Sequence, residues 1–259
     1  MINLDLFDIE LAKKSLKEDG FYIAKKLIDQ KIIKEMQFFW KDYYKNINHS
    51  NLQRVQWNPY LGEPNKVGYS EDKDQLFYRT FDFLWNKPIH KLTKDVVSNI
   101  RKLTISLVEE DIGFGNLVTD DRYGIYATSS YYPANRGFLK EHSDSNKNKT
   151  LIHHIIPLTF LNEDYNSGGL FLKDRKGNQI EIDSLVSYGD VIFYDGLLPH
   201  GVNKIMSDNE GIGRIQIFAI PTNFEYPTES KVLFDDLKKL ELIKDLIKLP
   251  FRKLKKKFS

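Results

Sequence analysis

Two histidines and one aspartate in this chain have the types and the spacing of a metal site. His142 and Asp144 are separated by one residue just after a predicted strand, at a turn rich in Ser, Asn and Lys, and residues two apart on an extended chain point to the same side. His200 follows a second strand pattern, Gly-Asp-Val-Ile-Phe-Tyr at 189–194. Two imidazoles and one carboxylate on one face of a metal suit Fe(II) and leave positions open for other ligands. We therefore predict an iron site; the alternative for His142 and Asp144 is a polar turn.

A single arginine opens the strand pattern that follows His200. Arg214 stands fourteen residues after that histidine and precedes the apolar run 215–220. A guanidinium that enters the interior of a sheet needs a partner anion, because an unpaired buried charge is costly. Its planar fork suits a carboxylate that is bound through two hydrogen bonds. We therefore expect Arg214 to bind a carboxylate.

The order of these residues resembles the signature of the Fe(II)/2-oxoglutarate-dependent oxygenases: a His-x-Asp pair, then a distal histidine, then a basic residue on the last strand. Other segments are similar to members of that superfamily. Ser-Tyr-Tyr-Pro at 130–133 resembles the Asn-x-Tyr-Pro segment of plant-type members, and Gly-Gly-Leu at 168–170 resembles a strand start between the metal ligands. Asp-Gly-Phe-Tyr-Ile at 19–23 resembles the first strand of the phytanoyl-CoA and prolyl hydroxylase branches. The resemblance spans residues 120–222 and, more loosely, 15–40.

The resemblance implies a set of cofactors and the residues that bind them. Fe(II) is bound by the His-Asp-His triad, and Arg214 binds the distal carboxylate of the co-substrate 2-oxoglutarate, with O2 as the second co-substrate. The residues expected beside that carboxylate are Tyr132, Ser130 and Gln216. Two of them depart from the family pattern, because Ser130 replaces its asparagine and Gln216 replaces the serine of Arg-x-Ser.

The activity that the resemblance implies is hydroxylation of an unactivated C–H bond in a small molecule or in a sugar or lipid intermediate, with release of succinate and CO2. The carboxylate of Asp144 favours hydroxylation over halogenation, since related halogenases have a small residue there. Desaturation, ring closure and demethylation share the same ligands. Arg136 and Arg79 are candidates for binding an anionic substrate. His153 and His154 lie on opposite faces of one strand pattern, so one of them faces the interior, more as a core histidine than as a further ligand.

Three alternatives stay open. One is a metal-dependent isomerase or epimerase of the cupin type, which would explain the histidines without an arginine that binds 2-oxoglutarate. Another is a hydroxylase that acts on a protein side chain. The third is a binding or scaffold protein with a decayed site, although every expected ligand is present.

The elements that must position these residues change in character along the chain. Residues 1–120 are mostly helical in pattern, and residues 121–222 contain short β-rich runs separated by turn formers, as in a jelly roll. The predicted helices are 8–18, 29–40 and 89–109, a long loop covers 46–75, and the predicted strands are 21–24, 123–132, 151–161, 168–173, 179–182, 190–195 and 213–220. We expect an α+β fold, a single oxygenase domain over 1–250 with a double-stranded β-helix (jelly-roll) core, flanking N-terminal helices and a C-terminal helix at 230–249.

Composition excludes several classes of protein. The 259 residues include no cysteine, which excludes disulfides and Cys-ligated metals, and no apolar run is long enough to span a membrane. The net charge of +2 gives no reason to expect nucleic acid as a partner, and we expect a cytoplasmic protein.

The basic character lies in the last nine residues. Residues 251–259 hold five basic groups and no acidic group, which leaves 33 basic against 36 acidic groups in residues 1–250. This tail also carries two phenylalanines and a leucine, a composition typical of peripheral contact with an anionic membrane. The alternative is that the helix before it packs on the jelly roll and the tail only aids solubility.

Overall fold

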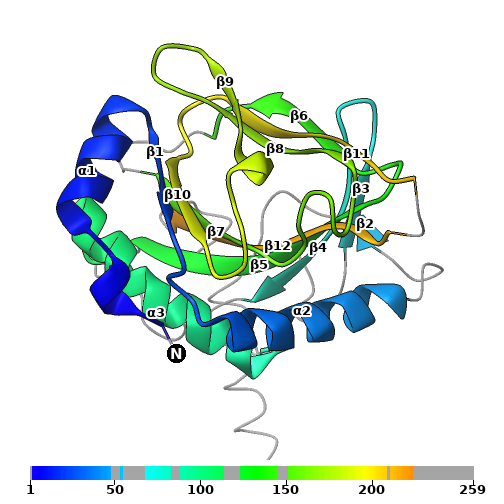
Figure 1. Ribbon diagram of the computed structural model, residues 1–259, viewed down its shortest axis with the longest axis horizontal. Coiled ribbons are helices and arrows are strands. Elements are labelled where there is room, and N and C mark those ends of the chain that lie inside the picture. The colour runs from blue at the N-terminus through cyan, green and yellow to red at the C-terminus, as the bar shows by residue number, and fades with distance from the viewer. Residues whose placement is uncertain are drawn as a thin grey trace, which may run out of the picture.

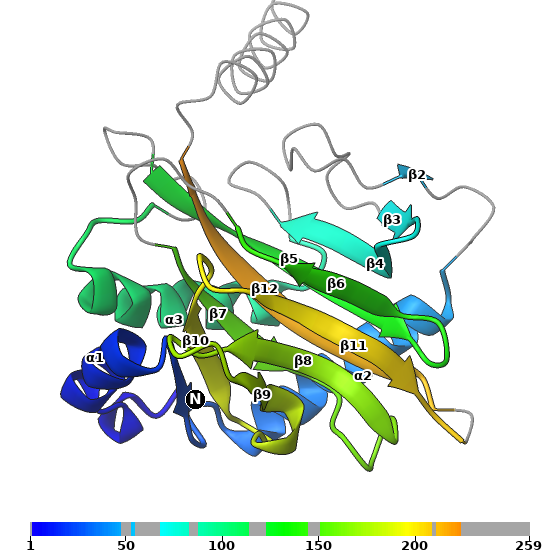
Figure 2. The ribbon, with the colours of Figure 1, turned by 90° about the horizontal axis from the view of Figure 1, so that it is seen from above.

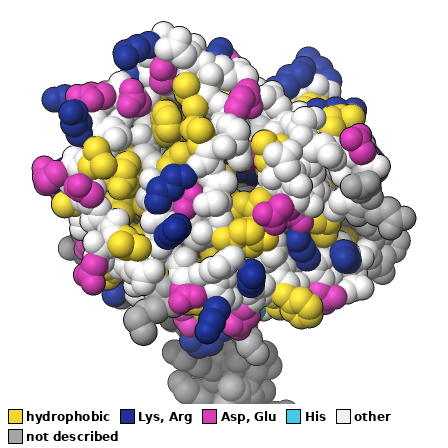
Figure 3. All heavy atoms as spheres, in the orientation of Figure 1, with side chains coloured by type: hydrophobic (Ala, Val, Ile, Leu, Met, Phe, Trp, Pro, Cys, Tyr) yellow, Lys and Arg dark blue, Asp and Glu magenta, His cyan; other side chains and the backbone are white. Residues whose placement is uncertain are grey.

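A computed structural model of the protein describes residues 2–47, 53–54, 68–82, 88–113, 123–144, 151–208 and 211–223. The predicted C-terminal helix at 230–249 and the basic tail at 251–259 lie outside the described residues. None of the described helices is long and apolar enough to cross a membrane. On the face shown in Figure 3, Lys and Arg side chains are interspersed with Asp and Glu side chains.

The core is one strongly curled sheet, in which strands distant in sequence lie side by side (Figures 1 and 2). Its order is β1-β10-β7-β12-β5-β4-β6-β11-β8-β9, with β3 on the outer edge of β4 and β2 on β3. The strands are β1 (Phe21–Ala24), β2 (Gln53–Arg54), β3 (Gly68–Glu71), β4 (Gln75–Asp82), β5 (Tyr123–Pro133), β6 (Phe138–His142), β7 (Ile152–Pro157), β8 (Ser167–Lys173), β9 (Gln179–Glu181), β10 (Val191–Asp195), β11 (His200–Met206) and β12 (Gly213–Asn223). All pairs except β2–β3 are antiparallel, so the predicted jelly roll is confirmed.

Alternation along β12 separates the interior of the jelly roll from the helical layer. Ile215, Ile217 and Ala219 belong to the apolar cluster that includes the helices. Phe218 belongs to a second cluster, inside the curled sheet, with Ile155, Tyr194 and other residues of β7, β8 and β10. Because side chains alternate between the faces of a strand, Arg214 and Gln216 point to the same interior side as Phe218.

Three helices cover the outer face of one half of the sheet (Figure 2). They are α1 (Ile9–Glu18), α2 (Gln30–Lys45) and α3 (Lys91–Val108). The described residues also form two short 3-10 helices, η1 (Leu4–Leu6) and η4 (Ile182–Ser184). Asp8 and Asp29 cap α1 and α2 with their side chains, as N-cap residues do. The buried face of α2 is spaced at helical intervals: Ile33, Met36, Trp40 and Tyr44.

The three predicted helices and the predicted strands of 21–24 and 123–220 are confirmed within a few residues, but five strands, β2, β3, β4, β6 and β11, lie outside the predicted ranges. Residues 75–82 form β4, and 68–71 form β3, within and just after the segment expected to be a loop. β6 (FLKEH) contains no buried side chain and β11 (HGVNKIM) mixes polar with apolar residues, so both lack the apolar runs that marked the other strands. The first 120 residues are therefore less purely helical than expected, and β4 lies in the sheet between β5 and β6.

Candidate metal centre

The adjacent ends of β6 and β11 bring the two triad histidines together. His142 and His200 are direct partners in the antiparallel register, and their ring centroids lie 4.3 Å apart. Asp144 follows β6, and its backbone N–H donates to the carbonyl of Gly196 at 2.9 Å. Its carboxylate oxygens lie 3.9 Å from His142 Nε2 and 3.6 Å from His200 Nε2. One ligand atom from each residue lies within 4.8 Å of the others, so the three can share one metal ion.

Backbone carbonyls fix both imidazoles in the tautomer that a metal needs. His142 Nδ1 lies 3.0 Å from the carbonyl oxygen of Lys140, and His200 Nδ1 lies 2.8 Å from that of Leu198. A carbonyl only accepts, so each Nδ1 carries the proton and each Nε2 keeps its lone pair for the centre. Burial also lowers the pKa of His200, which keeps this ring neutral. The two nitrogens and one carboxylate oxygen are the donor set that suits Fe(II).

A third histidine stands behind the carboxylate. His153 is fully buried, and its Nδ1 lies 3.6 Å from Asp144 Oδ2 and 3.2 Å from the hydroxyl of Tyr194. Burial lowers the pKa of His153 to about 4, against the opposing charge of Asp144. His154 points the other way, with Nδ1 3.3 Å from the Thr104 hydroxyl of α3. The prediction that one of the two faces the interior is confirmed, and that one is His153.

A cavity of about 160 Å³ opens from the triad into the jelly roll. His142, Asp144 and His200 line it together with apolar side chains that include Ile155, Leu170 and Phe218. Arg79, Gln216 and three tyrosines, Tyr126, Tyr132 and Tyr194, also line it. The site thus combines a metal-binding group, an apolar wall and a polar group that contains one guanidinium.

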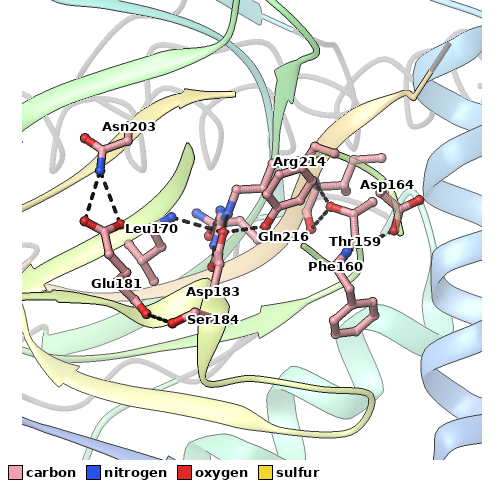
Figure 4. A network of polar contacts seen from close by, with 12 residues as sticks. Thr159, Phe160, Asp164, Leu170, Glu181, Asp183, Ser184, Asn203, Arg214 and Gln216 are labelled. Carbon is pink, nitrogen blue, oxygen red and sulfur yellow. Dashed lines mark hydrogen bonds and ion pairs between the residues drawn. The ribbon is translucent and has the colours of Figure 1, made fainter. Parts of the chain in front are cut away.

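The guanidinium of Arg214 has a different partner from the one expected. Its Nε lies 2.5 Å from Asp183 Oδ2 and its Nη2 lies 3.0 Å from Asp183 Oδ1, as Figure 4 shows. Its Nη1 donates to the side-chain oxygen of Gln216. Burial alone would lower the pKa of Arg214, but the carboxylate of Asp183 raises it above its usual range. Arg214 does bind a carboxylate, but this carboxylate belongs to the chain, and Arg214 is not among the residues that line the cavity.

The other expected site residues divide into two groups. Ser130, Tyr132 and Gln216 are buried on the interior face of β5 and β12. Arg79 is buried beside them, and its Nε donates to Ser130 Oγ at 3.0 Å. Arg136, by contrast, is exposed and paired with Glu71 at 3.3 Å, and it is not among the cavity residues.

Two residues that contact the site or its arginine were missed by sequence reasoning. Asp183 lies in η4, in a segment without any motif, and pairs with Arg214 across 31 residues of chain. Tyr194 lies on the predicted strand 190–195, and its ring is 5.1 Å from the ring of His200. The alternation of β10 places Tyr194 in the interior, and this was the one available signal.

No protein-family model matches the sequence, and no curated protein does. Solved structures match the fold. A prolyl-4-hydroxylase from Pseudomonas putida aligns with a TM-score of 0.57 over 83% of this chain and 98% of its own, at 10% identity. A prolyl hydroxylase from Trichoplax adhaerens, in complex with a hypoxia inducible factor peptide fragment, has a TM-score of 0.57 over 83% and 89%, at 14% identity.

An enzyme of a different activity has the same fold. SnoN, a non-heme alpha ketoglutarate dependent epimerase from nogalamycin biosynthesis, aligns with a TM-score of 0.56 over 83% of this chain and 82% of its own, at 9% identity. SnoN has also been solved with Fe3+ and alpha ketoglutarate. At these identities the similarity establishes the fold: the chain has the double-stranded β-helix on which these non-heme iron enzymes are built.

Proposed function

We propose that the protein is an Fe(II)- and 2-oxoglutarate-dependent oxygenase that hydroxylates an unactivated C–H bond of a small molecule, such as a sugar or lipid intermediate. The observation that carries the proposal is the triad itself: two imidazoles with their Nε2 lone pairs directed toward one carboxylate, at the mouth of an interior cavity. The shared fold with 2-oxoglutarate-dependent enzymes supports it.

The residues present fit the iron that this function requires. His142, Asp144 and His200 would hold Fe(II) from one side and leave its other positions to 2-oxoglutarate and O2. When bound, Fe(II), 2-oxoglutarate and O2 would together supply the oxidising chemistry that converts a C–H group to an alcohol, with succinate and CO2 as the other products.

The chain itself contributes orientation and exclusion of water. The carbonyls of Lys140 and Leu198 fix the orientation of the two imidazoles, with Nδ1 as the donor and Nε2 directed to the metal site. The apolar side chains of the wall keep water away from the reacting carbon. His153 and Tyr194 lie close to the site but stay neutral, because burial lowers the pKa of the first and raises the pKa of the second. We infer that they support Asp144 and do not transfer protons.

The test is release of succinate from 2-oxoglutarate by the full chain. We expect succinate to form only when Fe(II) and O2 are both present, and we expect His200→Ala to abolish it. Arg136→Gln, a change at an exposed arginine outside the cavity, is the control and should leave succinate formation intact. Metal binding without any affinity for 2-oxoglutarate would contradict the proposal and favour an isomerase of the cupin type.

A further inference from the structure

Arg79 is a buried cation in the cavity, and none of the described residues supplies an anion to it. It lies on β4, its side chain is only 6% exposed, and it lines the cavity together with the triad. Its Nε donates to the neutral hydroxyl of Ser130, and its Cζ lies 4.6 Å from the ring centroid of Phe77. Within the part of the chain that the structure describes, no carboxylate is paired with Arg79. A guanidinium buried in this way needs a compensating anion, because nothing else offsets the free-energy cost of removing its charge from water.

Arg214 is in the opposite situation. It is 1% exposed, and both oxygens of Asp183 bind it. The same carboxylate accepts hydrogen bonds from the Tyr165 hydroxyl at 2.6 Å and from the Leu170 backbone N–H at 3.0 Å. Figure 4 shows Arg214 directed at this carboxylate. A ligand carboxylate would have to displace Asp183 and leave that charge buried without its cation. Arg214 is therefore compensated already, whereas no described carboxylate compensates Arg79.

The surroundings of Arg79 suit the far end of a short dicarboxylic acid. Arg79, Ser130 and Gln216 are in one row, since Ser130 is the register partner of both others. Tyr132 lines the same end of the cavity; burial raises its pKa, so its hydroxyl stays a donor, and Arg79 opposes that rise. Guanidinium, hydroxyl and amide groups are the donors that bind a carboxylate.

The ring of Phe218 lies near both Arg79 and His153. Its centroid is 6.0 Å from Arg79 Cζ and 5.0 Å from the His153 ring, and His153 Nδ1 is 3.6 Å from Asp144. Arg79 and the triad thus line one cavity, with Phe218 in its wall.

We propose that Arg79, on β4, binds the distal carboxylate of 2-oxoglutarate, and that the Arg214–Asp183 pair is a structural ion pair. The proposal rests on the proposed function. It moves the anion-binding cation from the last strand of the jelly roll to the strand that lies between β5 and β6, and it assigns Tyr132 and Gln216 as neighbouring donors.

The test compares two 2-oxo acids that differ only at their far end. 2-Oxoglutarate and 2-oxopentanoate are titrated by calorimetry, without O2, into the metal-loaded full chain. In the wild type we expect 2-oxoglutarate to bind about 10- to 150-fold more tightly, as a charge-assisted bidentate contact predicts. Arg79→Gln should remove this preference by weakening 2-oxoglutarate alone. Unchanged binding of 2-oxopentanoate shows that the variant is folded, and Arg136→Gln is the matched control.

Two results would overturn the assignment, and they differ. If Arg79→Gln keeps the wild-type preference while Arg214→Lys loses it, Arg214 is the carboxylate-binding residue and only the assignment to Arg79 fails. If the wild-type chain binds neither acid, the proposed function itself fails and the assignment fails with it.

Discussion

Replacing Asp183 with asparagine tests whether the buried ion pair is structural. Asp183→Asn keeps the size of the side chain but removes the charge that compensates Arg214, while both side chains are almost fully buried. It also replaces one acceptor oxygen by an amide that cannot accept from Arg214, Tyr165 or Leu170. Breaking a buried pair by removing one partner costs about 3–5 kcal/mol. We expect the free energy of unfolding to fall by that amount.

The assay is equilibrium denaturation in urea, followed by far-ultraviolet circular dichroism. A loss of this size lowers the midpoint by about 1–2 M urea. The control is the same substitution in an exposed pair, Asp74→Asn, where Asp74 binds Lys140 and both side chains are more than half exposed. Solvent screens such pairs, so we expect no resolvable change there. A loss of less than about 1 kcal/mol for Asp183→Asn would show that Arg214 does not depend on Asp183, and would make Arg214 available to a ligand.

Two further substitutions test neighbouring features. Gly169 has φ +111°, and a Cβ there would lie 2.2 Å from Asp183 Oδ2, so Gly169→Ala should lower the urea midpoint. The control is Gly177→Ala, because Gly177 has a similar positive φ of +87° but no atom within 4 Å of its Cβ position, and its loss should be smaller. Equal losses for the two variants would refute the clash. Burial lowers the pKa of His154 to about 3. Between pH ~6.5 and this pKa, the unfolded chain carries a proton on His154 and the native chain does not. Stability therefore falls with acid by up to ~1.4 kcal/mol per pH unit in this range. His154→Gln should flatten this dependence, and equal slopes in both proteins would contradict the buried neutral ring.

The helices and the strands with long apolar runs were predictable because their buried residues recur at helical spacing or at the alternating spacing of a strand. β12 and β10 alternate or run apolar, and α2 places Ile33, Met36 and Trp40 at helical spacing. The triad was predictable for a related reason. A His-x-Asp at one strand end and a histidine at another meet when the two strands pair, and the register of His142 with His200 confirms that they do.

The contents of the cavity were predictable only in part. Alternation correctly places Arg214 in the interior, but it cannot reveal which carboxylate compensates it, because Asp183 reaches it from a 3-10 helix. Arg79 was identified only as a candidate for binding a substrate anion, since β4 mixes polar and apolar side chains and was not predicted as a strand. Pairings between distant segments depend on the curl of the sheet, which leaves no local pattern in the sequence.

The most direct test of the metal centre is the visible absorption band that appears when a 2-oxo acid chelates Fe(II). The band requires the iron and 2-oxoglutarate to bind at one centre, so it reports both in a single titration without O2. We expect the band in the wild-type chain, and we expect it to be absent in His142→Ala and when Zn(II) replaces Fe(II). Binding of 2-oxoglutarate to the Fe(II)-loaded wild type without this band, or an equal band in His142→Ala, would contradict the site described by His142, Asp144 and His200.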